Sequence, residues 1–142
     1  MKALILTVAF ALSATAAHAM ELGKCEDAGV DITTIMQPAA QNSRTFANNS
    51  IVVYNIDTEE PAAASAGLAI IFPDPQAPEG GSLCYSLTFL RAIDVMKAVS
   101  SYDANKGLLL TIPAYENIDG EKTKAVTIKL RINQAKGTVT QE

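Results

Sequence analysis

The chain has one histidine and no tryptophan in 142 residues. His18 lies within the first 19 residues, which have the layout of a secretory signal peptide. Imidazole is the side chain whose unperturbed pKa lies nearest neutral pH. Without it, the remaining chain cannot form Ser-His-Asp or Cys-His catalytic sites, nor histidine-ligated zinc, copper or non-haem iron centres. The sequence therefore predicts no metal, no cofactor and no enzymatic activity of these classes.

Aromatic residues are few, and basic residues form no run. The chain has four tyrosines and four phenylalanines, so stacking platforms for bases or sugars are sparse. It has 11 basic against 15 acidic residues, and a nucleic-acid partner is not expected because no basic groove or stripe can be assembled. An anionic membrane surface is disfavoured too, since no basic amphipathic helix is visible.

Long apolar runs are also absent. The N-terminal run, residues 3–12, is ten residues long, whereas a membrane-spanning helix needs about 20. Lys2 before this run and Ala17-His18-Ala19 after it are typical of a cleaved signal peptide at residues 1–19. No later segment is long enough to span a membrane. Residues 20–142 are therefore expected to form a single exported domain, soluble in the periplasm or outside the cell.

The chain has only two cysteines, Cys25 and Cys84. In an exported chain of this size they are expected to form one disulfide, which the chain-entropy model values at roughly 4 kcal/mol. The alternative is a reactive or metal-bound thiol pair. Because neither cysteine lies in a C-x-x-C pattern and no histidine is left to assist, the disulfide is the preferred interpretation.

What the chain does contain is alternating polar and apolar residues with turn residues about every ten positions, which is typical of antiparallel β-proteins. Residues 125–133 are the clearest example: Val126 and Ile128 face one way, Thr127 and Lys129 the other. The predicted fold is an all-β, small antiparallel β-sandwich of about seven to eight strands, with a small β-barrel as the alternative. The expected strands are 30–36, 50–56, 67–72, 84–90, 108–112, 125–133 and 137–141.

Residues 90–102 are ambiguous between strand and helix. Ile93, Met96 and Val99 fit helical spacing, but the following turn, which ends at Gly107, favours a hairpin into the strand at 108–112. We therefore predict a strand, with Asp94 facing outward by alternation. A buried Asp94 would instead be a candidate catalytic group, because burial raises a carboxyl pKa.

The apolar faces of 108–112 and 125–133 also predict the pairing between these strands, because opposed residues in an antiparallel pair point to the same side. The connection is then centred on Asp119 as a three-residue loop, Ile118 to Gly120, with Gly120 in the left-handed region. The predicted pairs are Leu108 with Leu130, Leu110 with Ile128, and Ile112 with Val126.

Two acidic segments resemble a calcium site and a glycoside hydrolase site, but the spacing of their carboxylates does not support either function. Residues 115–122 contain acids around a glycine, but an EF-hand alignment lacks the two essential carboxylates, so a solvated hairpin tip is preferred. Residues 57–65 contain three carboxylates on one loop, whereas glycoside hydrolysis needs two that converge across a cleft. A solvated connection is the better prediction there.

The most distinctive loop is residues 73–81, "PDPQAPEGG", just before Cys84. Prolines restrict its conformations, so it could present a preorganised surface to a partner; the alternative is a stiff connector between sheets. The candidate binding residues are Pro73, Asp74, Pro75, Pro78 and Glu79.

These observations favour a non-catalytic exported β-domain that binds a protein or another envelope component, and one subclass is an inhibitor of an external hydrolase. A different alternative is a carrier of a small apolar ligand, which predicts a cavity lined by residues such as Leu110, Ile128 and Phe89. A third is a histidine-independent carboxylate hydrolase, for which Asp94 is the first residue to inspect.

Overall fold

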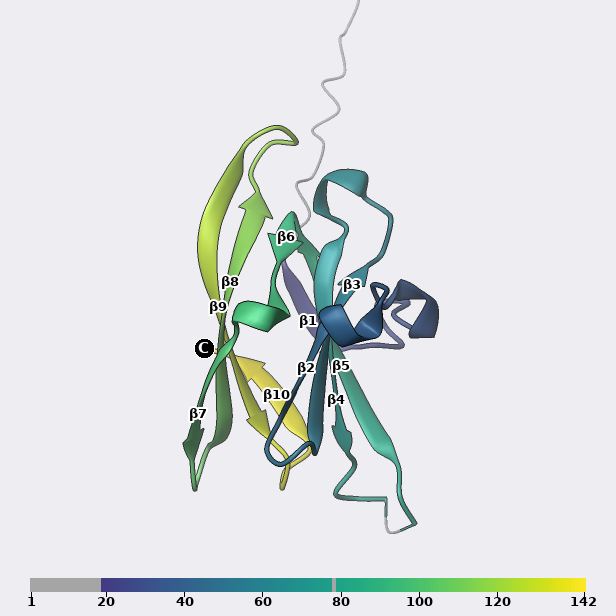
Figure 1. Ribbon diagram of the computed structural model, residues 1–142, viewed down its shortest axis with the longest axis vertical. Helices are drawn as coiled ribbons and strands as arrows, with labels where there is room; N and C mark the ends of the chain where they lie inside the picture. Colours follow the sequence, from purple (N-terminus) through teal and green to yellow (C-terminus); the bar gives the residue numbers. More distant parts are fainter. Residues whose placement is uncertain (1–18, 78) are drawn as a thin grey trace, which may run out of the picture.

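The computed structural model of the protein describes residues 19–77 and 79–142 (Figure 1). The expected signal peptide, His18 included, therefore lies outside the described residues except for Ala19. Within these residues, no helix is long and apolar enough to cross a membrane.

In this described part of the chain, ten strands form two antiparallel sheets that face each other (Figure 1). Neither sheet closes on itself, so the predicted all-β sandwich is confirmed and the barrel alternative is wrong. Sheet A has the strand order β1-β5-β4-β3-β2, with β1 Glu21–Lys24, β2 Ser43–Phe46, β3 Ile51–Asp57, β4 Ala66–Pro73 and β5 Ser82–Leu90. Sheet B has the order β10-β9-β8-β6, and β7 also pairs with β8; its strands are β6 Ala92–Ile93, β7 Val99–Asp103, β8 Gly107–Asn117, β9 Thr123–Asn133 and β10 Thr138–Gln141.

Alternation places one face of each sheet in a shared core. Leu68, Ile70 and Phe72 of β4 are buried there, as are Leu110 of β8 and Ile128 of β9. Leu110 and Ile128 therefore lie in the packed core between the sheets. The cavity expected for a small-ligand carrier is not formed by these residues.

The segment between β1 and β2 crosses the outer face of sheet A, because these two strands occupy opposite edges of that sheet. Cys25 and Val30 pack there against Ile56 and Ala69, forming a second, smaller apolar cluster. The predicted disulfide is confirmed: Cys25 is bonded to Cys84 of β5, with the two Cα atoms 5.4 Å apart. The crossing segment is thus anchored covalently where it begins.

The strand predicted at 30–36 is wrong, and β1 and β2 were not predicted. Residues Ile32–Thr34 form a 3₁₀ helix, η1, whose first turn is capped by the Asp31 carboxylate accepting from the Thr33 backbone N–H. Ile32 is 76% exposed, so the alternation at this point does not reflect burial. Short 3₁₀ helices also occur at Ala39–Gln41 (η2) and Ala62–Ala64 (η3).

The strand predicted at 90–102 is correct in part. Its two ends form β6 and β7, both on the same side of β8, but the 3₁₀ helix η4, Val95–Lys97, interrupts them. Asp94 caps this helix by accepting from the Met96 backbone N–H at 3.0 Å, and it forms an ion pair with Lys97 at 3.4 Å. Its side chain is 40% exposed, as predicted. Strand alternation is not the cause, because Asp94 lies between β6 and η4 and in neither of them.

The predicted faces of β8 and β9 are correct, but their register is wrong by two residues. Leu108 opposes Ile132, Leu110 opposes Leu130 and Ile112 opposes Ile128. A shift of two preserves every face, so the hydrophobic pattern alone cannot detect it. The connection consequently comprises the five residues 118–122, and Gly120 has the expected positive φ of 86°.

Candidate functional site

Four hairpin turns lie together at one end of the sandwich, the lower end in Figure 1. They connect β2 to β3, β4 to β5, β7 to β8, and β9 to β10, and comprise residues 47–50, 74–81, 104–106 and 134–137. We call this surface the hairpin end. Since loops on a rigid β-scaffold tolerate varied side chains, such a surface is suited to recognition.

The β4–β5 turn extends furthest from the body of the sandwich (Figure 1). Its closing contact is a hydrogen bond from the Asp74 N–H to the Gly81 carbonyl at 2.9 Å. The Asp74 carboxylate also accepts from the Gln76 N–H at 2.8 Å, and the Ala77 N–H donates to the Asp74 carbonyl at 3.2 Å. The loop is therefore held by its own backbone and by Asp74.

Hydrogen bonds and packing contacts between the turns hold the hairpin end together. The Tyr85 hydroxyl donates to the Gly137 carbonyl at 2.8 Å, and Gln134 Nε2 donates to Ser50 Oγ at 2.9 Å. Gly137 has φ of 65°, and a Cβ built there would lie 3.3 Å from Pro75 and closer still to Leu83. The β9–β10 turn is therefore packed against both the β2–β3 and the β4–β5 turns.

Shallow cavities lie between the described residues of these turns. One, of about 140 Å³, lies at the base of the β4–β5 turn and is lined by residues that include Asp74, Pro75, Leu83 and Lys136. The other, of about 190 Å³, lies between the β7–β8 and β9–β10 turns. Both are smaller than the roughly 300 Å³ of drug-sized ligand sites, but they could accept single side chains of a partner.

Charges of both signs occur at the hairpin end. Lys24 and Lys136 line the cavity beside Asp74, and the Lys24 ammonium lies 4.0 Å from the Tyr85 ring centroid. In the β7–β8 turn, hydrogen bonds from the Asn105 and Lys106 N–H groups lower the pKa of Asp103 below its ordinary value of 3.8. This surface thus combines fixed charges with exposed prolines.

The structure places the predicted binding residues as follows. Pro73, Pro75 and Glu79 are exposed, and Asp74 is half-buried because its carboxylate holds the turn; Pro78 lies outside the described residues. The loop joins two neighbouring strands of sheet A, so the alternative of a connector between sheets is wrong. The expected anchor is confirmed, since Cys84 lies in β5 only three residues beyond Gly81.

The two acidic segments have the conformations predicted for solvated connections. In the β8–β9 tip, Asn117 Oδ1 accepts from the Gly120 N–H and Asp119 Oδ1 accepts from the Lys122 N–H, so these oxygens hold the turn. Residues 57–65 connect β3 to β4 within sheet A. Nowhere in residues 19–77 and 79–142 are three or more His, Cys, Asp or Glu side chains grouped so that they could hold a metal ion.

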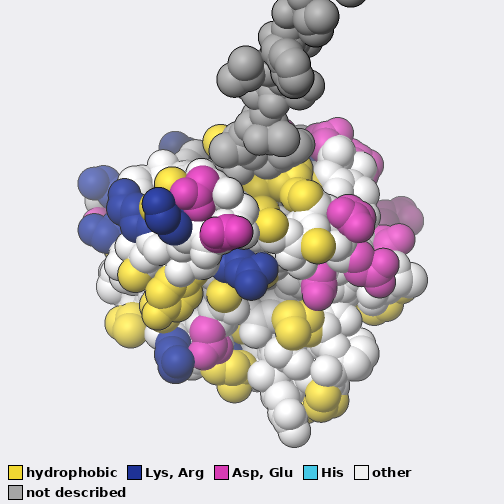
Figure 2. Space-filling view, turned by 90° about the horizontal axis from the view of Figure 1, so that it is seen from above, with side chains coloured by type: hydrophobic (Ala, Val, Ile, Leu, Met, Phe, Trp, Pro, Cys, Tyr) yellow, Lys and Arg dark blue, Asp and Glu magenta, His cyan; other side chains and the backbone are white. Residues whose placement is uncertain are grey.

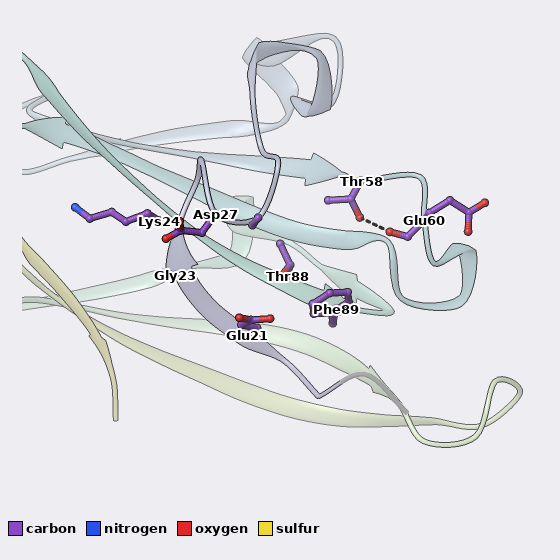
Figure 3. A pocket seen from close by; sticks show the side chains of 9 residues that line it. Glu21, Gly23, Lys24, Asp27, Thr58, Glu60, Thr88 and Phe89 are labelled. Carbon is purple, nitrogen blue, oxygen red and sulfur yellow. Dashed lines mark hydrogen bonds between the residues drawn. The ribbon is translucent and has the colours of Figure 1, made fainter. Parts of the chain in front are cut away.

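A further cavity, of about 210 Å³, lies on the outer face of sheet A and was not predicted. Figure 3 shows the side chains around it; the lining residues are Glu21, Gly23, Lys24, Asp27, Ala28, Thr58, Glu60, Thr88 and Phe89. They come from three separate parts of the chain, so no local motif could reveal their association. We call it the outer cavity.

A β-bulge shapes the outer cavity. Ala66 pairs with Leu90, but Leu68 pairs with Leu87, so Thr88 and Phe89 together oppose Gly67. Phe89 has φ of 65°, which is uncommon for a bulky residue. Simple alternation would turn Phe89 inward with Leu87, whereas the bulge places it at the outer cavity. In the sequence, Gly67 is the residue that could have indicated this bulge, because glycine inside a strand often marks one.

No family model matches the chain, and comparisons with curated proteins and with solved structures also found no match.

Proposed function

We propose that this protein is a non-catalytic exported β-domain that binds a protein partner of the cell envelope or its surroundings through the hairpin end. The observation that supports the proposal is the set of contacts between the turns of that end. The β9–β10 turn contacts both the β2–β3 and the β4–β5 turns. A surface that is already ordered loses little conformational entropy on binding. The site includes Pro73, Asp74, Pro75 and Glu79.

Export to the periplasm or the exterior is part of this proposal. The disulfide between Cys25 and Cys84 supports it, because disulfides persist in oxidising compartments. The signal-peptide layout of residues 1–19 supports it independently, from the sequence.

One form of the proposal is inhibition of an external hydrolase. The support is the shape of the β4–β5 turn, which extends beyond its neighbours and carries exposed prolines (Figure 1). Such a loop could enter a concave site and resist rearrangement there. A panel of secreted hydrolases assayed with and without the purified protein tests this form: dose-dependent inhibition that is lost when residues 75–80 are replaced supports it.

The alternatives receive less support from the geometry. A carrier would need an interior cavity, yet Leu110 and Ile128 are packed in the core and Phe89 lies on the outer face of sheet A. A carboxylate hydrolase would need an acid in a buried site. Asp94 instead caps η4, and the buried polar residues in the described part of the chain are Asn55, Ser86 and Thr88.

The test is affinity capture from native envelope or culture extract with the oxidised protein, read by mass spectrometry. One variant has residues 75–80 replaced by a Gly/Ser sequence of equal length. The matched control has residues 118–122 replaced in the same way, since this tip lies at the opposite end of the sandwich. Circular dichroism and thermal unfolding verify that both variants fold.

We expect one protein to be enriched by the wild type and the control, and to be lost with the 75–80 variant. Retention by the 75–80 variant, equal loss with the control, or no enriched protein at all would each contradict the proposal.

A further inference from the structure

The cavity of about 140 Å³ at the base of the β4–β5 turn has two lysines on its wall, from parts of the chain far apart in sequence. Lys24 is the last residue of β1, and Lys136 lies in the β9–β10 turn. The wall also includes Pro75 of the β4–β5 turn and Leu83 of β5. We call it the turn cavity. Because it lies at the hairpin end, its chemistry bears on what that end can recognise.

The ammonium group of Lys24 has a defined position. Lys24 pairs with Tyr85 across β1 and β5, and its ammonium lies 4.0 Å from the centroid of the Tyr85 ring, an attractive contact. That ring lies parallel to the buried ring of Phe72, with the centroids 6.0 Å apart, and its hydroxyl donates to the Gly137 carbonyl. Figure 3 shows the Lys24 side chain extending away from the outer cavity. The ammonium is therefore ordered without a partner.

The second lysine lies on a turn whose backbone is held. The Lys136 N–H donates to the Asn133 side-chain oxygen at 3.1 Å, and the Gly137 N–H donates to the Gln134 carbonyl at 3.3 Å. A Cβ on Gly137 would lie 2.9 Å from Leu83, so the turn fits closely against β5. The Lys136 side chain itself is exposed. Its ammonium is therefore accessible to a partner while its backbone is fixed.

Neither ammonium group is neutralised by an ion pair within the described part of the chain, where the ion pairs involve other residues. Asp74 is the one acid among the described residues of the wall. Its carboxylate accepts from the Gln76 N–H of its own turn at 2.8 Å. Two ammonium groups and one carboxylate leave one positive charge in excess, which a single carboxylate of a partner would balance.

The chain as a whole carries the opposite charge. It has 15 acidic and 11 basic residues. Figure 2 views the end of the sandwich opposite the hairpin end, and there acidic side chains gather on the sheet A side. A carboxylate of a partner is therefore repelled by that side of the molecule and attracted locally at the turn cavity. Such complementarity specifies the position and orientation of a partner.

We propose that the turn cavity receives a carboxylate side chain, Asp or Glu, of the protein that binds the hairpin end, an inference that rests on the proposed function. The Lys24 and Lys136 ammonium groups contact the carboxylate, and Leu83 and Pro75 contact the aliphatic part of the same side chain. The volume of about 140 Å³ is below that of drug-sized ligand sites and suits a single side chain. The cavity thus specifies an acidic residue that projects from the partner's surface.

The first test needs no knowledge of the partner. The oxidised, isotope-labelled protein is titrated with N-acetyl-glutamate methylamide, and with N-acetyl-glutamine methylamide as the neutral probe of matched shape. We expect saturable NMR shifts of the Gln76, Lys136 and Gly137 amide signals with the glutamate probe and none with the glutamine probe. Absence of saturable shifts at these amides, or equal shifts with the two probes, would overturn the proposal.

Variants assign the binding to the two lysines. Lys24→Gln and Lys136→Gln should each weaken binding of the glutamate probe about two- to fivefold, as expected for one exposed ion pair. Lys24→Arg retains the charge and should bind as the wild type does. Lys106→Gln is the matched control, because it removes the same charge from the β7–β8 turn and Lys106 is not among the described residues of this wall. An equal loss with Lys106→Gln would indicate unspecific charge attraction and overturn the proposal.

Asp74→Asn separates charge balance from a structural role of the wall. The variant retains an oxygen that can accept from the Gln76 N–H, but it loses the negative charge beside the two lysines. Binding of the glutamate probe should therefore tighten about two- to fivefold. Thermal unfolding verifies that the variant folds. Unchanged or weaker binding would contradict the charge balance on which the proposal depends.

The affinity capture described above separates this proposal from the proposed function. The Lys24→Gln, Lys136→Gln double variant should lose the captured protein, and Lys106→Gln should retain it. If the double variant retains the protein while the 75–80 replacement loses it, the hairpin end binds the partner without a carboxylate in the turn cavity. If both variants retain the protein, binding does not occur through the hairpin end, and both proposals are wrong.

Discussion

At the scale of single residues, two glycines with the same backbone requirement lie in different surroundings. Gly107 and Gly120 have φ of 91° and 86°, a region that residues with a Cβ rarely adopt. A Cβ on Gly107 would overlap the Ile132 carbonyl oxygen, whereas a Cβ on Gly120 would meet no atom within 4 Å. Substitutions at these two glycines therefore separate the free-energy cost of a left-handed backbone from the cost of a steric overlap.

Gly120→Ala should therefore destabilise the protein by about 1–2 kcal/mol, the cost of the left-handed region for a residue with a Cβ. Gly107→Ala should cost about 3 kcal/mol or more, because β9 must also move. Chemical denaturation of both variants measures the difference. Equal losses would show that the close approach of Gly107 to β9 is not maintained in solution.

The lowered pKa values of two carboxyl groups determine how the stability of the fold should depend on pH. Hydrogen bonds from Asn105 and Lys106 lower the pKa of Asp103, and the hydrogen bond from Arg131 lowers the pKa of Glu142. A carboxyl whose pKa is lower in the folded state stabilises the fold above its unfolded pKa, and this contribution is lost as pH falls through the folded value.

The melting temperature of the wild type should therefore exceed that of an Asp103→Asn, Glu142→Gln double variant at about pH 6, and the difference should shrink towards about pH 3. Thermal unfolding followed by circular dichroism across this range provides the measurement. A difference that stays constant or grows on acidification contradicts the assigned hydrogen bonds.

At the scale of elements, the sequence predicts a strand well where alternation coincides with burial on one face only. Residues 125–133 meet this condition and lie within β9. Residues 30–36 also alternate, but Asp31 caps a 3₁₀ helix there instead. The register of β8 with β9 could not be fixed, because hydrophobic faces specify it only to within two residues.

The candidate site was predictable to a smaller extent. The β4–β5 turn was identified because proline and glycine mark a loop by local chemistry. Its association with Gln134 and Ser50 depends on strand order, which local patterns do not contain. The outer cavity depends on strand order too, since β1 lies beside β5 only in the folded sheet.

The crossing segment, residues 25–42, should depend on the disulfide more than the rest of sheet A does. Its other attachments are few, such as the hydrogen bond from the Met36 N–H to the Asn55 carbonyl at 3.0 Å and the apolar contacts of Val30. The Cys25→Ala, Cys84→Ala variant should lose up to roughly 4 kcal/mol of stability, because the bridge joins residues 59 apart in sequence.

Hydrogen exchange should accelerate in this variant first at residues 25–42, and least in β8 and β9, which form the longest pair of strands. Mass spectrometry of proteolytic fragments measures this order. Uniform acceleration across both sheets would show that the disulfide stabilises the whole sandwich and not chiefly the crossing segment.

At the scale of the whole molecule, the sandwich separates two surfaces of different character. The hairpin end carries exposed loops braced across both sheets, whereas the outer cavity lies on one face of sheet A and is surrounded by acids. The core between the sheets is packed with aliphatic side chains. The packed interior thus stabilises the fold, while the hairpin end is the surface proposed for recognition.

The most direct test of the proposed binding function is photo-crosslinking in the native host from single positions. A photoreactive residue at Gln76 or Glu79 reports on the hairpin end, and one at Glu121 reports on the opposite tip; all three residues are exposed. We predict that Gln76 and Glu79 form a crosslink to the same protein, and that Glu121 does not. Absence of a crosslink at both hairpin positions, or the same crosslink from Glu121, would contradict binding through the hairpin end.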